Sequence, residues 1–129
     1  MLVALEQLLY GHPMTEPVYK ICPAAALQEA RERGRFEGSA DDARDGFVHL
    51  SAGHQVAGTL AKYFAGQRDL VLLAVDPERL GTRLLWETSR GGELFPHLYG
   101  PLDLDHVLSV EALVLQEDGS HRLPEGVAP

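Results

Sequence analysis

Leu70-Val71-Leu72-Leu73-Ala74-Val75 is an unbroken run of apolar residues that stands between Asp69 and Asp76. A strand with one wet face alternates polar and apolar residues, whereas a strand that is covered on both faces is apolar throughout. The run therefore predicts a central strand between the two aspartates, and such a strand requires cover on both of its faces.

Further short strands are expected before and after this run. Val18 to Ile21 lies between two prolines, and the Asp118-Gly119 pair is typical of a hairpin turn that leads into an edge strand at 120–123. The segments 41–46, 77–81 and 88–93 are polar or rich in glycine and are expected to be loops or turns. The remaining expected strands are 47–50, 83–87, 95–99 and 107–115.

The helices are expected mainly in the first half of the chain. Ala24 to Arg33 is rich in helix formers, and Gly34 suits the end of a helix. Ser51 suits the N-cap of a second helix that runs to about Phe64 with apolar residues at helical spacing. Two or three helices ahead of six or seven strands favour an α+β domain.

The composition limits the class of protein. The 129 residues suffice for a single hydrophobic core, and 45% of them are apolar. The formal charge is −8, and the chain has no basic patch or stripe of the kind that binds nucleic acid or an anionic membrane. We therefore expect a small-molecule ligand and neither a nucleic-acid nor a membrane partner. Whether the protein is a monomer or a homodimer stays open.

The cysteine content and the N-terminus bear on location and domain limits. Cys22 is the single cysteine, so an internal disulfide is impossible, which suits a reducing cytoplasm. The first residues include Glu6 and lack the positive region of a secretory signal. We expect a cytoplasmic protein with an N-terminal extension over 1–16, a single α+β domain over 17–123 and a frayed tail over 124–129.

Two distant segments have nearly the same sequence, Phe47-Val48-His49-Leu50-Ser51 and Phe95-Pro96-His97-Leu98-Tyr99. Because side chains alternate along a strand, each segment places an aromatic ring, an imidazole and a hydroxyl on one face. If the two strands are neighbours in one sheet, the imidazoles lie roughly 5 Å apart, which is the spacing of cross-strand pairs. The repeat predicts a pocket floor with two histidines, and it names no substrate.

The two histidines are the first candidates for catalysis because imidazole titrates near neutral pH. The alternative is that His49 and His97 are half-buried structural residues. Glu87 either orients an imidazole or pairs at the surface with Arg83 or Arg90. His49, His97 and Glu87 also have the composition of a two-histidine, one-carboxylate metal site, although no pair of histidines has the local spacing of metal ligands.

Other side chains are candidates for contacts with a ligand. Ser51 could cap a helix, touch a ligand, or do both. Tyr19 and Tyr99 could stack on a planar ring or belong to the core. Arg90, before Gly91-Gly92, could bind phosphate or carboxylate from a mobile loop, or lie in a solvated turn. The chain has no phosphate-binding loop, no dinucleotide fingerprint and no zinc-spaced cysteines.

A set of these segments resembles the small bacterial family known as domain of unknown function 952, over about Pro17 to Leu115. The Gly-Phe-Val-His-Leu-Ser and Phe-Pro-His-Leu-Tyr-Gly motifs are the most specific part of the resemblance. The family implies no established activity. The segments are Val18–Ile21, Gly38-Ser39 with Asp42, Asp45–Ser51 with Gln55, Trp86-Glu87 and Phe95–Gly100.

That family is similar, more remotely, to the ADP-ribosyltransferase superfamily. In its fold, three strands supply a histidine, a hydroxyl residue and a glutamate or variable residue around NAD. The resemblance implies that the first strand offers Lys20 where the superfamily often has histidine, the second offers 47–51 and the third offers His97. Neither the histidine nor the glutamate of the superfamily stands at its usual place in this chain.

We therefore expect an enzyme-like α+β domain with an ADP-ribosyltransferase-like split sheet, antiparallel or mixed, that binds NAD or a related nucleotide and acts as a transferase. His49 and His97 would carry protons or bind phosphate, and Glu87 would orient them. The alternatives are a non-catalytic binding or sensor domain and a metal-dependent enzyme that uses the same three residues. The expected ligand contacts are Tyr19, Lys20, Ser51, Arg90 and Tyr99.

Overall fold

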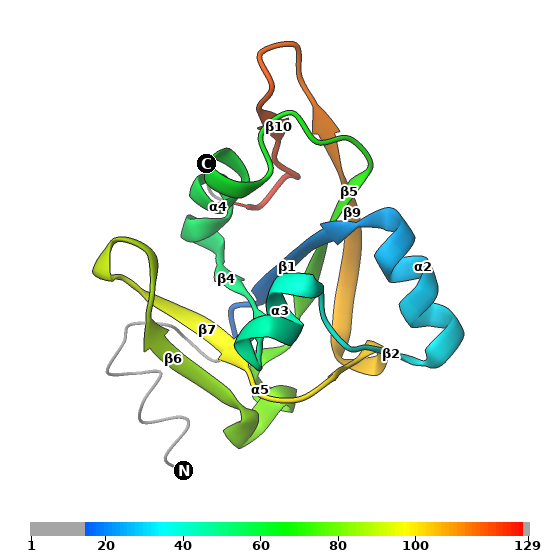
Figure 1. The fold of residues 1–129 in the computed structure, drawn as a ribbon, viewed down its shortest axis with the longest axis vertical. Helices are drawn as coiled ribbons and strands as arrows, with labels where there is room; N and C mark the ends of the chain where they lie inside the picture. The colour runs from blue at the N-terminus through cyan, green and yellow to red at the C-terminus, as the bar shows by residue number, and fades with distance from the viewer. Residues whose placement is uncertain (1–14, 128–129) are drawn as a thin grey trace.

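The computed structural model describes residues 15–127 as an α+β domain (Figure 1). Its larger sheet has five antiparallel strands in the order β10 (His121–Arg122), β9 (Val107–Leu115), β5 (Leu70–Val75), β1 (Val18–Pro23) and β4 (Ser51–Ala52). The apolar run of the sequence is β5, the middle strand. All of β5 is buried except Val71, which is partly exposed, so the expectation of a covered central strand is confirmed.

A second antiparallel sheet has the order β3 (Val48–His49), β7 (Leu94–Leu98) and β6 (Leu84–Thr88). A short pair, β2 (Arg35–Phe36) and β8 (Leu102–Asp103), lies apart from both sheets. The chain passes from the second sheet to the larger one at Leu50, between β3 and β4. The Leu50 N–H donates to the carbonyl oxygen of Pro96 at 3.1 Å and continues the contact with β7. The domain is thus built on two sheets that share one continuous segment.

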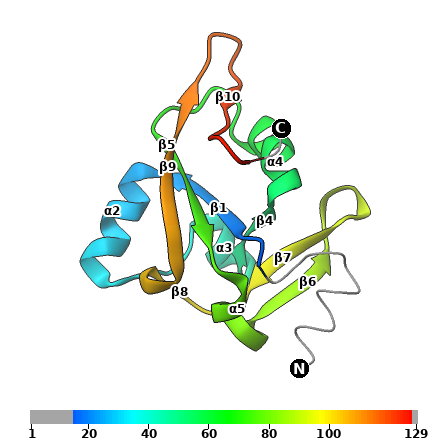
Figure 2. The same cartoon turned by 180° about the vertical axis from the view of Figure 1, so that it is seen from behind.

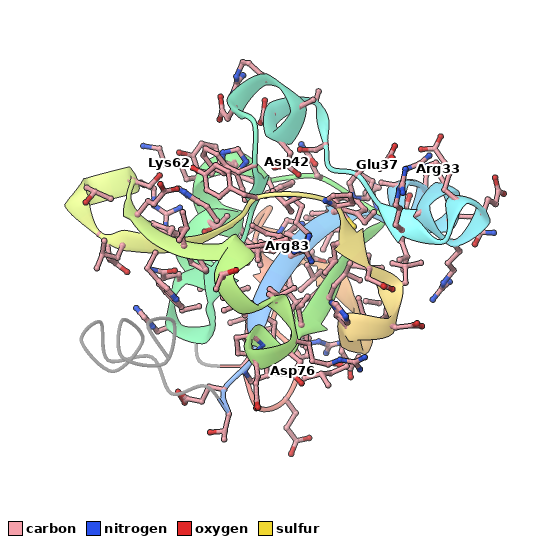
Figure 3. All side chains as sticks on the ribbon, turned by 90° about the horizontal axis from the view of Figure 1, so that it is seen from below. Arg33, Glu37, Asp42, Lys62, Asp76 and Arg83 are labelled. Carbon is pink, nitrogen blue, oxygen red and sulfur yellow. The ribbon has the colours of Figure 1, made fainter. Side chains whose placement is uncertain are left out.

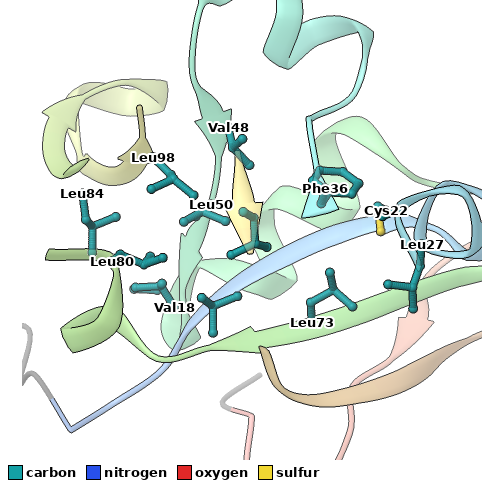
Figure 4. Packing of buried hydrophobic residues seen from close by; sticks show 14 of the residues in the cluster. Val18, Cys22, Leu27, Phe36, Val48, Leu50, Leu73, Leu80, Leu84 and Leu98 are labelled. Atoms are coloured by element: carbon teal, nitrogen blue, oxygen red, sulfur yellow. The ribbon is translucent and has the colours of Figure 1, made fainter. Parts of the chain in front are cut away.

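The main hydrophobic core lies where these elements meet (Figure 4). Val18 and Leu73 come from the larger sheet, Leu84 and Leu98 from the second sheet, and Leu27 from a helix. The helix that contains Leu27, α2 (Ala24–Arg33), and the β6–β7 hairpin lie on opposite sides of β5 and β9 in the front and back views (Figures 1 and 2). Burial of each such side chain stabilises the fold by about 1.5–3 kcal/mol.

The first expected helix is confirmed as α2 (Ala24–Arg33). It follows Pro23 and ends at Gly34, whose left-handed backbone (φ 87°) lets its N–H donate to the carbonyl of Ala30. The second, α4 (Val56–Tyr63), begins later than expected, after a 3₁₀ turn over Gly53–Gln55. Val56 and Leu60 of α4 pack against a second apolar cluster on the larger sheet.

Three sequence predictions are wrong for local reasons. Segment 41–46 is not a loop, because Ser39 and Asp42 form a capping box that starts α3 (Ala40–Asp45). Segment 77–81 is not only a turn, because Asp76 caps the short helix α5 (Pro77–Leu80). Residues 15–127 therefore contain four α-helices, not two or three. Ser51 does not cap a helix, since it lies in β4 and the Gln55 side chain instead accepts the N–H of Ala52 at 2.9 Å.

The expected domain limits, with an N-terminal extension over 1–16 and a tail over 124–129, stay a prediction. Most of the expected N-terminal extension lies outside residues 15–127. At the other end, Leu123 and Val127 pack against the second apolar cluster, and the expectation of a frayed tail stays a prediction. No helix of residues 15–127 is long and apolar enough to cross a membrane.

We expect Leu98→Ala to lower the free energy of unfolding by about 2–5 kcal/mol, because Leu98 is 0% exposed and its loss leaves a cavity beside β6. Urea denaturation followed by circular dichroism measures the change. Leu85→Ala is the matched control in the same sheet, since Leu85 is 37% exposed and its truncation should cost less than about 1 kcal/mol. Equal losses in the two variants would contradict the packing described here.

Candidate functional site

A cavity of about 270 Å³ is bounded by β1, β3, β7, α3 and α4, and by the tip of the β6–β7 hairpin at Ser89 and Arg90. Elements from most of the chain converge on it, so no single segment encodes the site. Two expected site residues, Glu87 and Tyr99, do not line the cavity. The expected residues that do line it are Tyr19, Lys20, His49, Ser51, Arg90 and His97.

The two look-alike segments are neighbours in space. His49 of β3 is directly opposite His97 of β7, and their ring centroids are 5.8 Å apart at an interplanar angle of 69°. The ring of Phe47 stacks on His97 at 4.0 Å and lies 4.7 Å from His49. The prediction that the imidazoles form a cross-strand pair is therefore confirmed. Ser51 reaches the same cavity from the other sheet, because the strand breaks at Leu50.

The carboxylate of Glu87 is hydrogen-bonded to the imidazole of His97. The Nδ1 of His97 lies 2.8 Å from Oε1 of Glu87, and the hydroxyl of Tyr99 donates to the same oxygen at 2.7 Å. Since a carboxylate only accepts, the proton of the neutral imidazole sits on Nδ1, and Nε2 keeps a lone pair. Among the described residues, Glu87 forms no ion pair with Arg83 or Arg90.

The environment of this pair favours the neutral imidazole. Burial lowers the pKa of His97 and outweighs the opposing effect of Glu87. Burial of Glu87 would raise the pKa of its carboxyl, but the hydrogen bonds from Tyr99 and His97 prevail and lower it. The Tyr99 pKa is raised, chiefly by its hydrogen bond to Glu87. Near neutral pH the result is a basic Nε2 on a ring that is oriented by a charged carboxylate.

His49 has a different environment. Its Nδ1 lies 2.5 Å from Oδ1 of Asp42, and its Nε2 lies 2.9 Å from Oδ2 of Asp45. A neutral imidazole has one N–H and can donate to only one of these carboxylates, whereas the protonated ring donates to both. His49 therefore joins β3 to α3 through both of its ring nitrogens.

Asp42 is the centre of this arrangement and is almost fully buried; Figure 3 labels it where α3 meets the rest of the domain. Lys20 donates to its Oδ2 at 2.9 Å, and the backbone N–H groups of Ser39 and His49 donate to its carboxylate at 2.8 and 2.9 Å. Burial alone would raise the pKa of Asp42. The hydrogen bonds from His49 and Ser39 and the charge of Lys20 outweigh burial and hold the pKa well below its usual range.

A second polar group lies on the α4 side of the cavity. The Ser51 and Thr59 hydroxyl oxygens are 3.1 Å apart, and Arg90 donates to Thr59 Oγ1 at 3.1 Å. The Arg90 guanidinium lies 4.8 Å from the ring centroid of Phe95 and 6.0 Å from that of Tyr63. Tyr19 contributes a partly buried ring to the cavity wall. The pKa of its hydroxyl is raised, chiefly by burial and also by the charge of Glu16.

Sequence reasoning assigned no role to Asp42, Asp45 or Thr59. Asp42 and Asp45 belong to the segments that carry the family resemblance, but the Lys20 partner of Asp42 is 22 positions away. The Ser39-x-x-Asp42 spacing is a capping-box signal that would have predicted α3 and so the position of its carboxylates. No local signal marks Thr59, which is one turn along α4 from Gln55.

The proposed metal-site alternative has no matching geometry. Within residues 15–127, no group of three His, Cys, Asp or Glu side chains is arranged to hold a metal ion. Glu87 lies outside the cavity and already binds Nδ1 of His97. The ring nitrogens of His49 both face aspartate oxygens.

The family profile for proteins of unknown function (DUF952) matches residues 21–110. The chain belongs to the DUF952 family. The match confirms the resemblance inferred from the motifs, and it includes both histidines, Glu87, Arg90 and Asp42. The DUF952 profile itself describes no activity.

Solved structures confirm the fold of this DUF952 domain. The crystal structure of protein CC0527 from Caulobacter crescentus has 53% sequence identity to this chain. The match covers 82% of this chain and 93% of the CC0527 chain, and its TM-score is 0.80. The solution NMR structure of CC0527 has 54% sequence identity. The match covers 81% of this chain and 90% of the CC0527 chain, and its TM-score is 0.73. No curated protein matches the chain.

We expect Asp42→Ala to cost about 3–5 kcal/mol of unfolding free energy, because it leaves the Lys20 ammonium, whose side chain is 6% exposed, buried without its partner. Chemical denaturation measures the loss. Lys20→Met combined with Asp42→Ala should recover part of it, since the uncompensated charge is then gone. Asp41→Ala is the control on the same helix, because the side chain of Asp41 is 70% exposed. A double variant no more stable than Asp42→Ala would refute this account.

The depressed pKa of Asp42 also predicts the acid limit of the fold. In the unfolded chain the carboxyl takes up its proton near pH 3.9, whereas the folded protein resists protonation to lower pH. The stability that Asp42 contributes is fully present above the pKa of the carboxyl in the unfolded chain. It is lost as the pH falls toward the lower pKa of the carboxyl in the folded protein. Denaturation midpoints measured between pH 6 and pH 2 should fall less steeply below pH 4 in Lys20→Met/Asp42→Asn than in the unmodified protein.

Proposed function

We propose that this domain is an enzyme that binds a nucleotide or NAD-like small molecule in the cavity and catalyses group transfer with His97 as general base. The observation that carries the proposal is the Glu87–His97 pair, in which the carboxylate binds Nδ1 at 2.8 Å while the ring lines the cavity. A carboxylate that orients an imidazole in this way fixes the tautomer with a basic Nε2, as in known hydrolytic sites.

The burial of His97 supports this role. A general base works best when it is unprotonated at the working pH and lies in a site from which water is largely excluded. The lowered pKa of His97 favours the unprotonated form near neutral pH. Phe47 covers one face of the ring at 4.0 Å and restricts its rotation, so that the imidazole is fixed both by Glu87 and by stacking.

The walls of the cavity support a ligand with a planar ring and a polar end. Tyr19, Tyr63, Phe64 and Phe95 supply aromatic surface, and Arg90 with Ser51 supplies donors. At about 270 Å³ the cavity is close to the lower end of ligand pockets, which span about 300–1,000 Å³. It has room for one moiety of a nucleotide, and the rest of a dinucleotide would extend outside it.

The remote resemblance to ADP-ribosyltransferases suggests the reaction, and the assignment to their split-sheet fold is part of this proposal. The acceptor oxygen would lose its proton to Nε2 of His97 and form a bond to C1′ of the ribose. Nicotinamide would leave with the electron pair of the broken C1′–N bond. Lys20, bound to Asp42, would shape the cavity wall from β1. His49 would position α3 or act as a second proton carrier.

NAD⁺ is the first substrate to test, with nicotinamide release measured by chromatography and binding of NAD⁺, ADP-ribose and AMP by calorimetry. We expect His97→Gln to reduce turnover by about a hundredfold or more while binding persists. Glu87→Gln should reduce turnover and change its pH profile, because the Gln amide can donate to Nδ1 and so select the wrong tautomer. The control is His54→Gln, since the side chain of His54 is 71% exposed and lies outside the cavity lining.

Three results would contradict different parts of the proposal. Binding of these ligands with no turnover would favour the non-catalytic binding domain. No binding of any of the three would remove the nucleotide class. Turnover that is unaffected in His97→Gln would exclude the role of this imidazole.

A further inference from the structure

The charges around the cavity are almost fully paired. Lys20 binds Asp42 at 2.9 Å, while Arg44 binds Asp41 at 3.1 Å and Asp45 at 3.0 Å. Both histidines also face carboxylates. The cavity-lining residues with carboxylate, ammonium or guanidinium groups are Lys20, Asp41, Asp42, Arg44, Asp45 and Arg90. Of these, within the described part of the chain, only Arg90 forms no salt bridge; its charge acts at longer range on Glu93, whose pKa is lowered chiefly by the hydrogen bond from Gln55 and also by Arg90.

Arg90 is nevertheless held in place. One guanidinium nitrogen donates to Thr59, and the group packs near the rings of Phe95 and Tyr63. A methyl group at Gly58 would come within 3.1 Å of a second guanidinium nitrogen, so the glycine leaves room for this position. A guanidinium has five N–H donors, and the contact with Thr59 uses one nitrogen. The remaining donors are presented without the entropy cost of fixing a free arginine side chain.

The adjacent hydroxyls extend this donor set. Because Arg90 can only donate, the Thr59 oxygen accepts, and the Thr59 proton is free to point to Ser51 at 3.1 Å. In that arrangement the Ser51 oxygen accepts, and its own proton is available to a ligand in the cavity. Ser51 is buried and 4% exposed, so a ligand acceptor is the natural partner for this proton. In that arrangement Arg90 and Ser51 both present donors to the cavity, and the positive charge of Arg90 favours an anionic acceptor.

We propose that Arg90 and Ser51 bind the phosphate of the ligand, so that the ligand lies with its anionic end at α4 and its reacting atom at His97. This inference rests on the proposed function, since it assigns an orientation and a substrate class within the same cavity. Phe95, which contacts Arg90, is two residues before His97 on the same face of β7. Two residues of strand span about 7 Å, so the phosphate and the reacting atom would be separated by about the length of one sugar unit.

AMP and adenosine form a matched pair that isolates the phosphate. With the unmodified protein, calorimetry should show AMP binding about tenfold or more tightly than adenosine. Arg90→Gln should remove this difference. Gly58→Ala should reduce it with the arginine still present, because the added methyl displaces the guanidinium. Lys62→Gln, a charge change on an α4 residue outside the cavity lining, should preserve it.

The outcomes separate this inference from the proposed function. If adenosine binds and AMP binds no more tightly, the phosphate site is wrong and the nucleotide proposal stands. If Arg90→Gln keeps the full preference for AMP and a normal melting temperature, Arg90 is not the phosphate ligand. If neither compound binds and NAD⁺ also fails to bind, the proposed function and the inference are both overturned.

Discussion

The buried ion pair between Lys20 and Asp42 is the interaction on which the site depends. It joins β1 to α3, and the same carboxylate accepts the N–H of His49 on β3. Three elements that share no backbone ladder are thus held by one side chain. A buried charge is costly unless each of its oxygens is satisfied. Here Oδ2 of Asp42 accepts from Lys20 and from the N–H of Ser39, while Oδ1 accepts the N–H of His49 and contacts its Nδ1. The position of α3 over the cavity follows from this one satisfied charge.

The two histidines occupy equivalent places in one ladder and yet have different environments. His97 is buried and has one carboxylate on Nδ1, whereas the His49 side chain is 35% exposed and has carboxylates on both nitrogens. The two imidazoles therefore differ in exposure and in the number of carboxylates that they contact, although they face each other across one ladder. The similarity of the two segments in sequence therefore conceals a difference that carboxylates outside the repeated motif create.

Much of the fold could be predicted because it is encoded locally. The apolar run of β5, the Pro23 and Gly34 limits of α2, and the Asp118-Gly119 turn each depend on neighbours in sequence. The helix α3 was missed because its six residues have no apolar periodicity and depend on a cap. The role of Ser51 was misread because a residue before a helix and a residue that enters a second sheet have the same local pattern. In the candidate site, the repeated motif revealed the histidine pair, while Asp42 was missed because its partner Lys20 is 22 positions away.

The β6–β7 hairpin brings Glu87 and His97 together through its register, in which Leu85 is opposite His97 and Glu87 is opposite Phe95. A slip of one residue between these strands would turn the carboxylate to the other side of the sheet. A slip of two residues would leave the carboxylate on the same side of the sheet but would move it along the strand by about 7 Å. The length of the connecting turn at Ser89–Glu93 therefore constrains the cavity as well as the fold: insertions and deletions there, which a surface loop ordinarily tolerates, would separate the His97 imidazole from the carboxylate that contacts its Nδ1.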